Sequence, residues 1–184
     1  MNNLLLHTCC GPCSTYSVKH LREEGLSLTA FWYNPNIHPF TEHQRRLEAM
    51  QSFARAVELP LVITEGYEMI EYFRRVVGRE GDRCGECYCL RLSKTAQVAR
   101  QEGFSAFSTT LLISPYQNHE LLREVGETVG REQGMEFYYE DLRPGFTESR
   151  RLSHEMELYR QKYCGCVYSE WERYAKVKFG DGFR

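Results

Sequence analysis

Eight cysteines gathered in three clusters are the feature that most restricts what this chain can fold into. Cysteine-free stretches of 70 and 74 residues separate the clusters. The clusters are Cys9, Cys10 and Cys13; Cys84, Cys87 and Cys89; and Cys164 and Cys166. Clustered thiols in a reducing cytosol serve metal or redox chemistry more often than structural disulfides. The sequence therefore points to a thiol-based functional site.

Strand-like apolar runs alternate with amphipathic helical segments along the chain. The predicted strands are residues 3–7, 26–33, 61–64, 104–109 and 136–139. The predicted helices are residues 14–24, a segment opening with a capping box at residues 41–44, residues 69–77, residues 87–102, a segment from residue 121 to near Gly134, and most of the tail from residue 147. This alternation predicts a parallel, doubly wound α/β sheet in a single domain, residues 1–184.

The overall composition excludes several classes of protein. The net charge of -2 excludes a strongly basic protein that coats nucleic acid by charge alone. The longest aliphatic runs are far shorter than the roughly 20 residues of a membrane span. No secretory signal is recognisable at the N-terminus, so we expect a cytoplasmic protein. The arginine pairs at residues 45–46, 74–75 and 150–151 are typical of solvated helix faces.

The first cluster, in His7-Thr-Cys-Cys-Gly-Pro-Cys13, lies directly after the first predicted strand. In a doubly wound sheet that position is at the edge where ligands bind. Backbone N–H groups at a helix start also stabilise thiolates. A redox pair formed by Cys10 and Cys13 is the alternative, but it leaves Cys9 and the second cluster without a role.

The other two clusters each allow two interpretations. The C-x-x-C-x-C spacing of residues 84–89 suits thiolate ligation of either zinc or an iron–sulfur cluster. A zinc ion would find four ligands in Cys9, Cys10, Cys84 and Cys87. The C-x-C pair of Cys164 and Cys166 suits a strained, easily reduced relay or two further metal ligands.

Six motifs, taken together and in order, resemble the QueH family of epoxyqueuosine reductases. They are His7-Thr-Cys-Cys-Gly-Pro-Cys13, Tyr33-Asn-Pro-Asn-Ile37, Arg83-Cys84 with Cys87, Thr109-Thr-Leu-Leu-Ile-Ser-Pro-Tyr116, Asp141-Leu-Arg-Pro-Gly145 and Tyr159-Arg-Gln-Lys-Tyr-Cys-Gly-Cys166. The resemblance implies a Rossmann-like fold of the HUP type. It also implies a two-electron reduction of epoxyqueuosine to queuosine at the wobble position of tRNA.

The resemblance further assigns roles to individual cysteines. It implies that a [4Fe-4S] cluster is bound by Cys9, Cys10, Cys84 and Cys87, and that Cys164 and Cys166 form a redox-active pair. Cys13 and Cys89 are further candidate metal ligands. HUP-type ATP pyrophosphatases have a Ser/Gly-rich phosphate loop after the first strand, and this chain has Cys-Cys-Gly-Pro-Cys there instead. We therefore expect no ATP binding.

Eight cysteines exceed what one cubane cluster requires, because a cubane takes four thiolates. If the C-terminal segment folds back over the site, the remaining thiolates suit an additional mononuclear iron, giving about five irons per chain. In the rival account, Cys164 and Cys166 shuttle electrons while Cys13 and Cys89 only pack. Two other functions stay open from the residues alone. One is a zinc-stabilised RNA-binding module without redox activity, and the other is a thiol-disulfide oxidoreductase.

The implied substrate also predicts residues outside the clusters. The reduction needs a proton donor, and the candidates by position are His7, His38 and Tyr116. A tRNA anticodon loop whose modified base is splayed out would be held by stacking and phosphate contacts. The aromatic candidates for stacking are Trp32, Tyr33, Phe40, Tyr116 and Phe146. An electron donor, which the sequence leaves unidentified, completes the expected partners.

Overall fold

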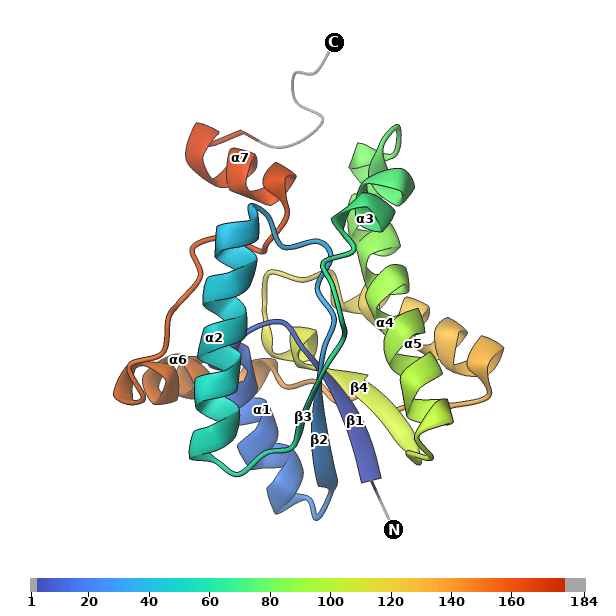
Figure 1. Ribbon diagram of the computed structural model, residues 1–184, viewed down its shortest axis with the longest axis vertical. Coiled ribbons are helices and arrows are strands. Elements are labelled where there is room, and N and C mark those ends of the chain that lie inside the picture. Colours follow the sequence, from blue (N-terminus) through green and yellow to red (C-terminus); the bar gives the residue numbers. More distant parts are fainter. Residues whose placement is uncertain (1–2, 178–184) are drawn as a thin grey trace.

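Five parallel strands form one sheet in the order β3-β2-β1-β4-β5, as Figure 1 shows for the strands near its centre. The strands are β1 (Asn3–Thr8), β2 (Ser27–Trp32), β3 (Leu61–Ile63), β4 (Ala106–Thr109) and β5 (Glu136–Phe137). The computed structural model describes residues 3–177, so the two ends of the predicted domain, residues 1–2 and 178–184, lie outside the described residues. The prediction of a parallel, doubly wound α/β sheet is confirmed.

Helices cover both faces of the sheet (Figure 1). One layer contains α1 (Gly11–Glu23), α2 (Phe40–Ala56) and α6 (Phe146–Glu155), and the other contains α4 (Arg83–Gln101) and α5 (His119–Gln133). The remaining helices are α3 (Met69–Val76), α7 (Val167–Ala175) and the short 3-10 helices η1 (Glu80–Asp82), η2 (Thr110–Ile113) and η3 (Arg143–Gly145). Among residues 3–177, no helix has both the length and the apolar character needed to cross a bilayer.

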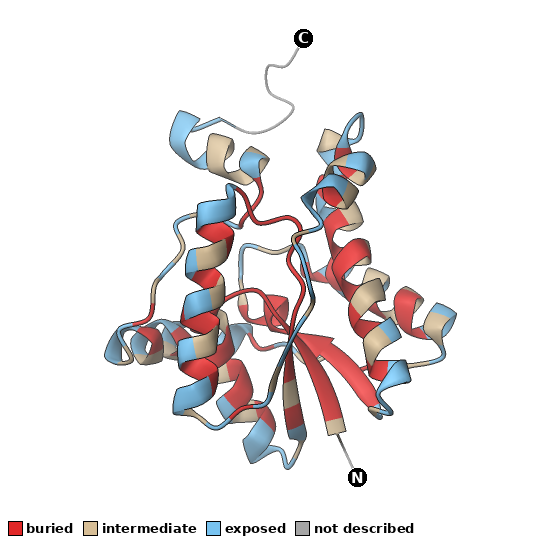
Figure 2. Cartoon of the chain, in the orientation of Figure 1, coloured by how far each residue is buried: buried red, intermediate tan, exposed pale blue. Residues whose placement is uncertain are grey.

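Alternate residues of the central strand β1 supply two separate cores, because successive side chains of a strand point to opposite faces. Leu4 and Leu6 pack in one buried cluster with Met50 of α2. Leu5 packs in the other, with Leu92 of α4 and Phe107 of β4. Figure 2 shows the buried strands between the buried inner sides of the helices. Each sheet face therefore has its own hydrophobic core.

Two helices begin earlier than the sequence pattern predicts. Helix α1 begins at Gly11 rather than at residue 14, because Cys10 is the N-cap and Pro12 suits the first turn. Helix α4 begins at Arg83 rather than at residue 87, so Cys84 lies in its first turn. Both shifts place cysteines of the first two clusters at helix starts.

Three other local predictions were wrong. The capping box at residues 41–44 does not form, because α2 already begins at Phe40 with Pro39 at the N-cap. The tail is not continuously helical around Cys164 and Cys166, which lie between α6 and α7. The strand predicted at residues 136–139 is shorter than expected, because only Glu136 and Phe137 pair with β4.

Candidate metal centre

The first cysteine cluster forms a compact group of sulfur atoms at the carboxyl end of β1. The Sγ atoms of Cys9, Cys10 and Cys13 all lie within 4.8 Å of one another. The Cys10 Sγ also accepts a hydrogen bond from the backbone N–H of Cys13 at 3.4 Å, which caps α1. A Cβ atom at Gly11 would lie only 2.8 Å from the carbonyl oxygen of Ala49, so the turn packs directly against α2. Close helix packing therefore fixes the position of these thiols.

The three thiols differ in acidity. Hydrogen bonds from the thiols of Cys10 and Cys13 hold the pKa of Cys9 well below its usual range. Burial raises the pKa of Cys10, and hydrogen bonds with Cys10 and Cys9 raise the pKa of Cys13. Cys9 is therefore the most acidic of the three thiols.

The second cysteine cluster lies close enough to the third for their charges to interact. Cys84 and Cys87 are one helical turn apart on α4, so they share a face of that helix. Burial raises the pKa of Cys87 to about 12, and the negative charges of Cys164 and Cys166 contribute to the rise. Cys9, Cys10, Cys87 and Cys166 all belong to one buried cluster, with Cys13 packed against it. Folding thus gathers sulfur atoms from all three clusters.

Cys89 is the exception among the eight cysteines. It follows Cys87 by two residues on α4, which is about 200° around the helix. Its Sγ lies 3.8 Å from the Ser93 hydroxyl and 4.0 Å from Nη1 of Arg75. We therefore define the thiol site without it, as Cys9, Cys10, Cys13, Cys84, Cys87, Cys164 and Cys166.

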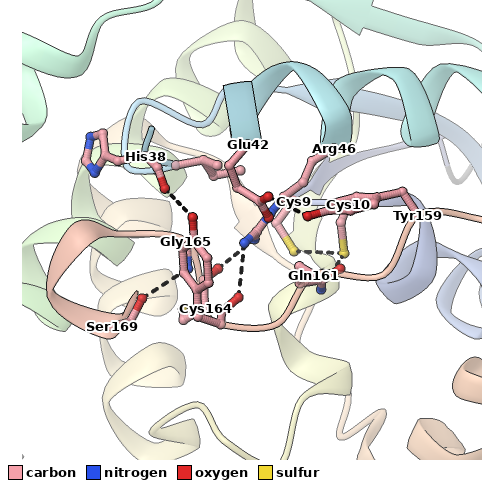
Figure 3. Close-up of polar contacts among 12 residues, drawn as sticks. Cys9, Cys10, His38, Glu42, Arg46, Tyr159, Gln161, Cys164, Gly165 and Ser169 are labelled. Carbon is pink, nitrogen blue, oxygen red and sulfur yellow. Dashed lines mark hydrogen bonds and ion pairs between the residues drawn. The ribbon is translucent and has the colours of Figure 1, made fainter. Parts of the chain in front are cut away.

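A non-helical segment between α6 and α7, residues 156–166, carries the third cluster to the site, and we call it the cysteine strap. Arg46 of α2 holds it by donating hydrogen bonds to the backbone oxygens of Cys164 at 2.8 Å and Tyr163 at 3.0 Å. The third donor of Arg46, Nε, pairs with Glu42 at 2.7 Å. Figure 3 shows the Arg46 side chain reaching from α2 to the strap. The expectation of a solvated pair at residues 45–46 was therefore wrong for Arg46, which is 1% exposed.

Further contacts fix the end of the strap against the segment before α2. The His38 N–H donates to the Gly165 oxygen at 2.8 Å, and the Tyr163 hydroxyl donates to the His38 oxygen at 2.5 Å. Gly165 has φ +152°, and a Cβ there would lie 3.2 Å from the Ile37 side chain. Only glycine combines that backbone angle with such close packing. The sequence pattern did not indicate the Ile37 contact that requires glycine at this position.

Two glutamine side-chain amides lie close to the sulfur atoms, and no sequence motif indicated either contact. The Nε2 of Gln161 in the strap lies 3.0 Å from the Sγ of Cys10 and 3.6 Å from that of Cys13. The Nε2 of Gln117 lies 3.5 Å from the Sγ of Cys164. N–H donors stabilise thiolates, so both amides favour an anionic site.

The three candidate proton donors lie in different environments. His7 is fully buried, pairs with Thr109 at 2.9 Å, and has its pKa lowered to about 3, chiefly by burial. Burial also lowers the pKa of His38 to about 4, and its Nε2 contacts the Pro35 oxygen. Tyr116 is 83% exposed beside Gln117. Tyr116 alone is therefore open to a substrate.

The five aromatic candidates for base stacking also differ in how exposed they are. Trp32 and Tyr33 are buried, so they are core residues rather than a stacking surface. Phe40 and Tyr116 are exposed, and Phe146 packs edge-on against Tyr116 with ring centroids 5.8 Å apart. The open aromatic surface next to the thiol site is therefore centred on Tyr116.

The donor set of the thiol site fits a thiolate-bound metal. Soft sulfur ligands select zinc, copper(I) or iron–sulfur clusters over hard cations. The Cys9, Cys10 and Cys13 group is buried apart from the half-buried Cys13, and it is held by helix packing. The fold and the site thus define a Rossmann-like protein with a group of cysteines that could hold a metal at the carboxyl edge of its sheet.

Comparison with known proteins identifies the family. The family model of epoxyqueuosine reductase QueH matches residues 4–172. A relative named epoxyqueuosine reductase QueH, from Dehalococcoides mccartyi, is 45% identical over 94% of this chain and 95% of its own length. A second relative of the same name, from Thermotoga maritima, is 36% identical over 96% of this chain and 94% of its own length. The chain therefore belongs to the epoxyqueuosine reductase QueH family and is an oxidoreductase.

A solved structure supports the fold independently of close sequence similarity. The crystal structure of a predicted subunit of tRNA methyltransferase from Methanocaldococcus jannaschii matches with a TM-score of 0.58. The match covers 84% of this chain and 75% of the other at 12% sequence identity. This likeness concerns the fold alone, and it agrees with the expected Rossmann-like architecture.

Proposed function

We propose that this chain reduces epoxyqueuosine to queuosine at the wobble position of tRNA, using an iron–sulfur cluster bound at the thiol site. The observation that carries the proposal is the compact group of Cys9, Cys10 and Cys13 at the edge of the sheet where such folds bind ligands. The charge of Arg91 acts on Cys87, Cys164 and Cys9, one cysteine from each cluster, which supports a single site. The relatives that match the chain over most of its length are named for this reaction.

The proposed [4Fe-4S] ligands are Cys9, Cys10, Cys84 and Cys87, from the end of β1 and the start of α4. Cys13 lies within 4.8 Å of two of them and is the candidate ligand for an additional mononuclear iron. Cys89 faces Ser93 and Arg75, so we assign it no metal. The site contains no Ser/Gly-rich phosphate loop, and the proposal includes no ATP.

The reaction needs two electrons and two protons, and it releases the epoxide oxygen as water while an alkene forms. No side chain reduces the epoxide directly at the required potential, so a cluster held by the thiol site would pass the electrons to it. The dithiol of Cys164 and Cys166 can supply the electrons and protons that the reduction consumes. Its oxidation to a disulfide releases two electrons and two protons. An external electron donor then reduces that disulfide again.

The substrate contacts follow from the position of the site. A modified base must leave its stack to reach an enzyme's reactive groups. Tyr116 is the exposed ring beside Gln117, whose amide contacts Cys164. We assign Tyr116 to stacking with the anticodon loop, next to the redox pair.

The test is metal analysis together with a single-turnover assay on anaerobically purified protein. We expect iron and acid-labile sulfide, a Mössbauer spectrum of a cubane, and loss of one oxygen atom from an epoxyqueuosine-containing anticodon stem-loop by mass spectrometry. Cys9→Ser should lose the cluster, and Cys89→Ser is the matched control that should keep it. Cys164→Ser should keep the cluster but lose turnover, and Cys13→Ser should lose about one of five irons.

Other outcomes would identify the competing functions. A colourless protein with one zinc and no sulfide would indicate a zinc-stabilised RNA-binding module. Turnover that survives complete removal of metal would indicate a thiol-disulfide oxidoreductase. Four irons in fully active protein would exclude the additional mononuclear iron and favour the dithiol relay.

A further inference from the structure

A fully buried arginine, Arg91, lies among the cysteines of the thiol site. It follows Cys87 by four residues and Cys84 by seven on α4, so all three share one face of the helix. Its side chain is only 1% exposed. A cation so completely removed from water is rare unless an anion accompanies it.

The guanidinium of Arg91 has a buried N–H donor group that makes no hydrogen bond among the described residues. Nε donates to the backbone oxygen of Cys87 at 3.3 Å. Nη2 is buried and has no hydrogen-bond partner among residues 3–177. Burying a charged donor without a partner is strongly unfavourable. The metal-free protein therefore leaves part of this cation uncompensated.

The groups around Arg91 are thiols and a phenol rather than carboxylates. Its charge interacts most strongly with Cys87, Cys164 and Cys9, and then with Tyr88. These three thiols come from three different clusters of the sequence. The buried cation is thus central to the thiol site, and the anion that fits it is a set of thiolates.

We propose that Arg91 is the fixed counter-cation of the thiol site, offsetting the negative charge of the thiolate ligands so that the bound cluster accepts an electron more readily. The inference rests on the proposed function, because it assumes a thiolate-bound cluster. Net charge and nearby charged groups are among the levers that set the reduction potential of such clusters. A guanidinium keeps its charge at every accessible pH, so this effect is permanent.

The first test compares Arg91→Met, which removes the charge, with Arg91→Lys, which keeps it. Iron and sulfide are measured first in the reconstituted full-length proteins, and the clusters are then titrated with dithionite and followed by electron paramagnetic resonance. Arg91→Met should lower the equilibrium constant for one-electron reduction more than tenfold, a fall in potential of more than about 59 mV. Arg91→Lys should stay within about threefold of the wild type. A loaded Arg91→Met protein within threefold of the wild type would overturn the proposal.

The second test needs no loaded variant and separates an electrostatic role from a structural one. A buried charge without a partner carries the full cost of its removal from water, so an apolar replacement of similar size is expected to be neutral or stabilising. Metal-free Arg91→Met should therefore unfold at the same or a higher temperature than metal-free wild type. The wild type should gain more thermal stability from metal loading than the variant does. An Arg91→Met protein that is markedly less stable, or unfolded, without metal would overturn the proposal.

The two proposals fail in distinguishable ways. If the wild type takes up zinc and no iron or sulfide, the proposed function fails. The thermal comparison is then run with zinc, and equal stabilisation of wild type and Arg91→Met by zinc would overturn the counter-cation role as well. A larger gain in the wild type would support that role for thiolate ligands in general.

Discussion

Two arginines are buried equally deeply in this small protein, but their surroundings differ. Arg46 and Arg91 are each 1% exposed. Arg46 pairs with the buried carboxylate of Glu42 and donates to two strap carbonyls, so its charge and its donors are used within the protein. Arg91 has neither a carboxylate among its strongest partners nor a partner for Nη2 among the described residues. Arg46 thus fastens the strap in addition to facing the thiol of Cys10, whereas the strongest charge partners of Arg91 are thiols and a phenol.

Gly11 is a residue whose missing side chain is structurally required. Its Cβ position lies 2.8 Å from the Ala49 carbonyl oxygen, a backbone atom that cannot move independently of α2. We expect Gly11→Ala to lower the free energy of unfolding by about 1–3 kcal/mol, measured by urea denaturation. Gly81→Ala is the matched control, since a Cβ at Gly81 meets open space, and it should change stability by less than about 0.5 kcal/mol. Equal losses for the two variants would contradict the packing argument.

Buried histidines make the fold sensitive to acid. Burial lowers the pKa of His38 and of His43 from 6.5 to about 4. Between these values the unfolded chain binds protons that the folded protein does not, so stability falls as the pH drops from 6.5 towards 4. His43→Gln keeps an acceptor for the Trp32 indole, now 3.2 Å from His43 Nε2, and should flatten this pH dependence. Urea unfolding at several pH values measures it, with the exposed His154→Gln as control.

The cysteine strap is an element without regular secondary structure, and side chains from elsewhere define its path. Arg46 and the segment around His38 hold the region of residues 163–165 by hydrogen bonds. The Tyr159 hydroxyl donates to Glu42 at 2.5 Å, which ties an earlier part of the strap to the same helix. Loosening of the contacts with α2 would therefore displace Cys164 and Cys166.

Removing the Arg46 fastening should therefore loosen the strap selectively. Arg46→Met removes two hydrogen bonds to strap carbonyls, and charged hydrogen bonds contribute roughly 1.5–3 kcal/mol each. We expect amide hydrogen exchange of residues 157–166 to become at least tenfold faster, while exchange in β1 changes little.

The Glu42→Gln/Arg46→Met double variant separates this effect from an unpaired carboxylate at Glu42. Arg55→Met, an exposed position on the same helix, should leave exchange unchanged. Loosening spread evenly over the whole protein in Arg46→Met would argue against a local fastening.

Local sequence patterns predicted which helices and strands exist better than they predicted the residues at which these elements begin and end. The strands and most helices follow from apolar periodicity, which depends on which face is buried. The early starts of α1 and α4 were not predicted, because cysteine is not a usual N-cap residue and the Asp82 side chain makes no capping hydrogen bond. The strap was predicted as helix because its docking depends on Arg46 and His38, more than 100 residues away.

At the scale of the whole molecule, topology explains how distant cysteines meet. The central strand β1 lies between β2 and β4, so loops from both halves of the chain reach the same sheet edge. The sequence pattern predicts this convergence for the first cluster from fold logic alone. The strap then adds the third cluster by crossing back to α2 (Figure 3). Arg91 and Gln161 could not be assigned from sequence, because their roles exist only once the clusters have met.

The last prediction concerns how the whole protein holds its proposed RNA substrate. Tyr116 is 83% exposed and precedes Gln117, whose amide lies 3.5 Å from the Cys164 sulfur. Stacking of one base on an aromatic side chain contributes about 1–3 kcal/mol. Tyr116→Ala should therefore weaken binding of an anticodon stem-loop by roughly ten- to a hundredfold, while Tyr116→Phe, which keeps the ring, should bind like the wild type. Fluorescence anisotropy with labelled stem-loop measures both.

The same titrations, repeated at several salt concentrations, separate stacking from charge. Phosphate contacts make the logarithm of the affinity fall linearly with the logarithm of salt concentration. Despite the net charge of -2, we expect such a fall between about 50 and 200 mM salt, because local basic groups rather than net charge contact the backbone. Tyr116→Ala should shift this line downward without changing its slope, since stacking releases no counterions. An affinity independent of salt, or a slope altered by Tyr116→Ala, would mean that the loop is held differently from the way proposed.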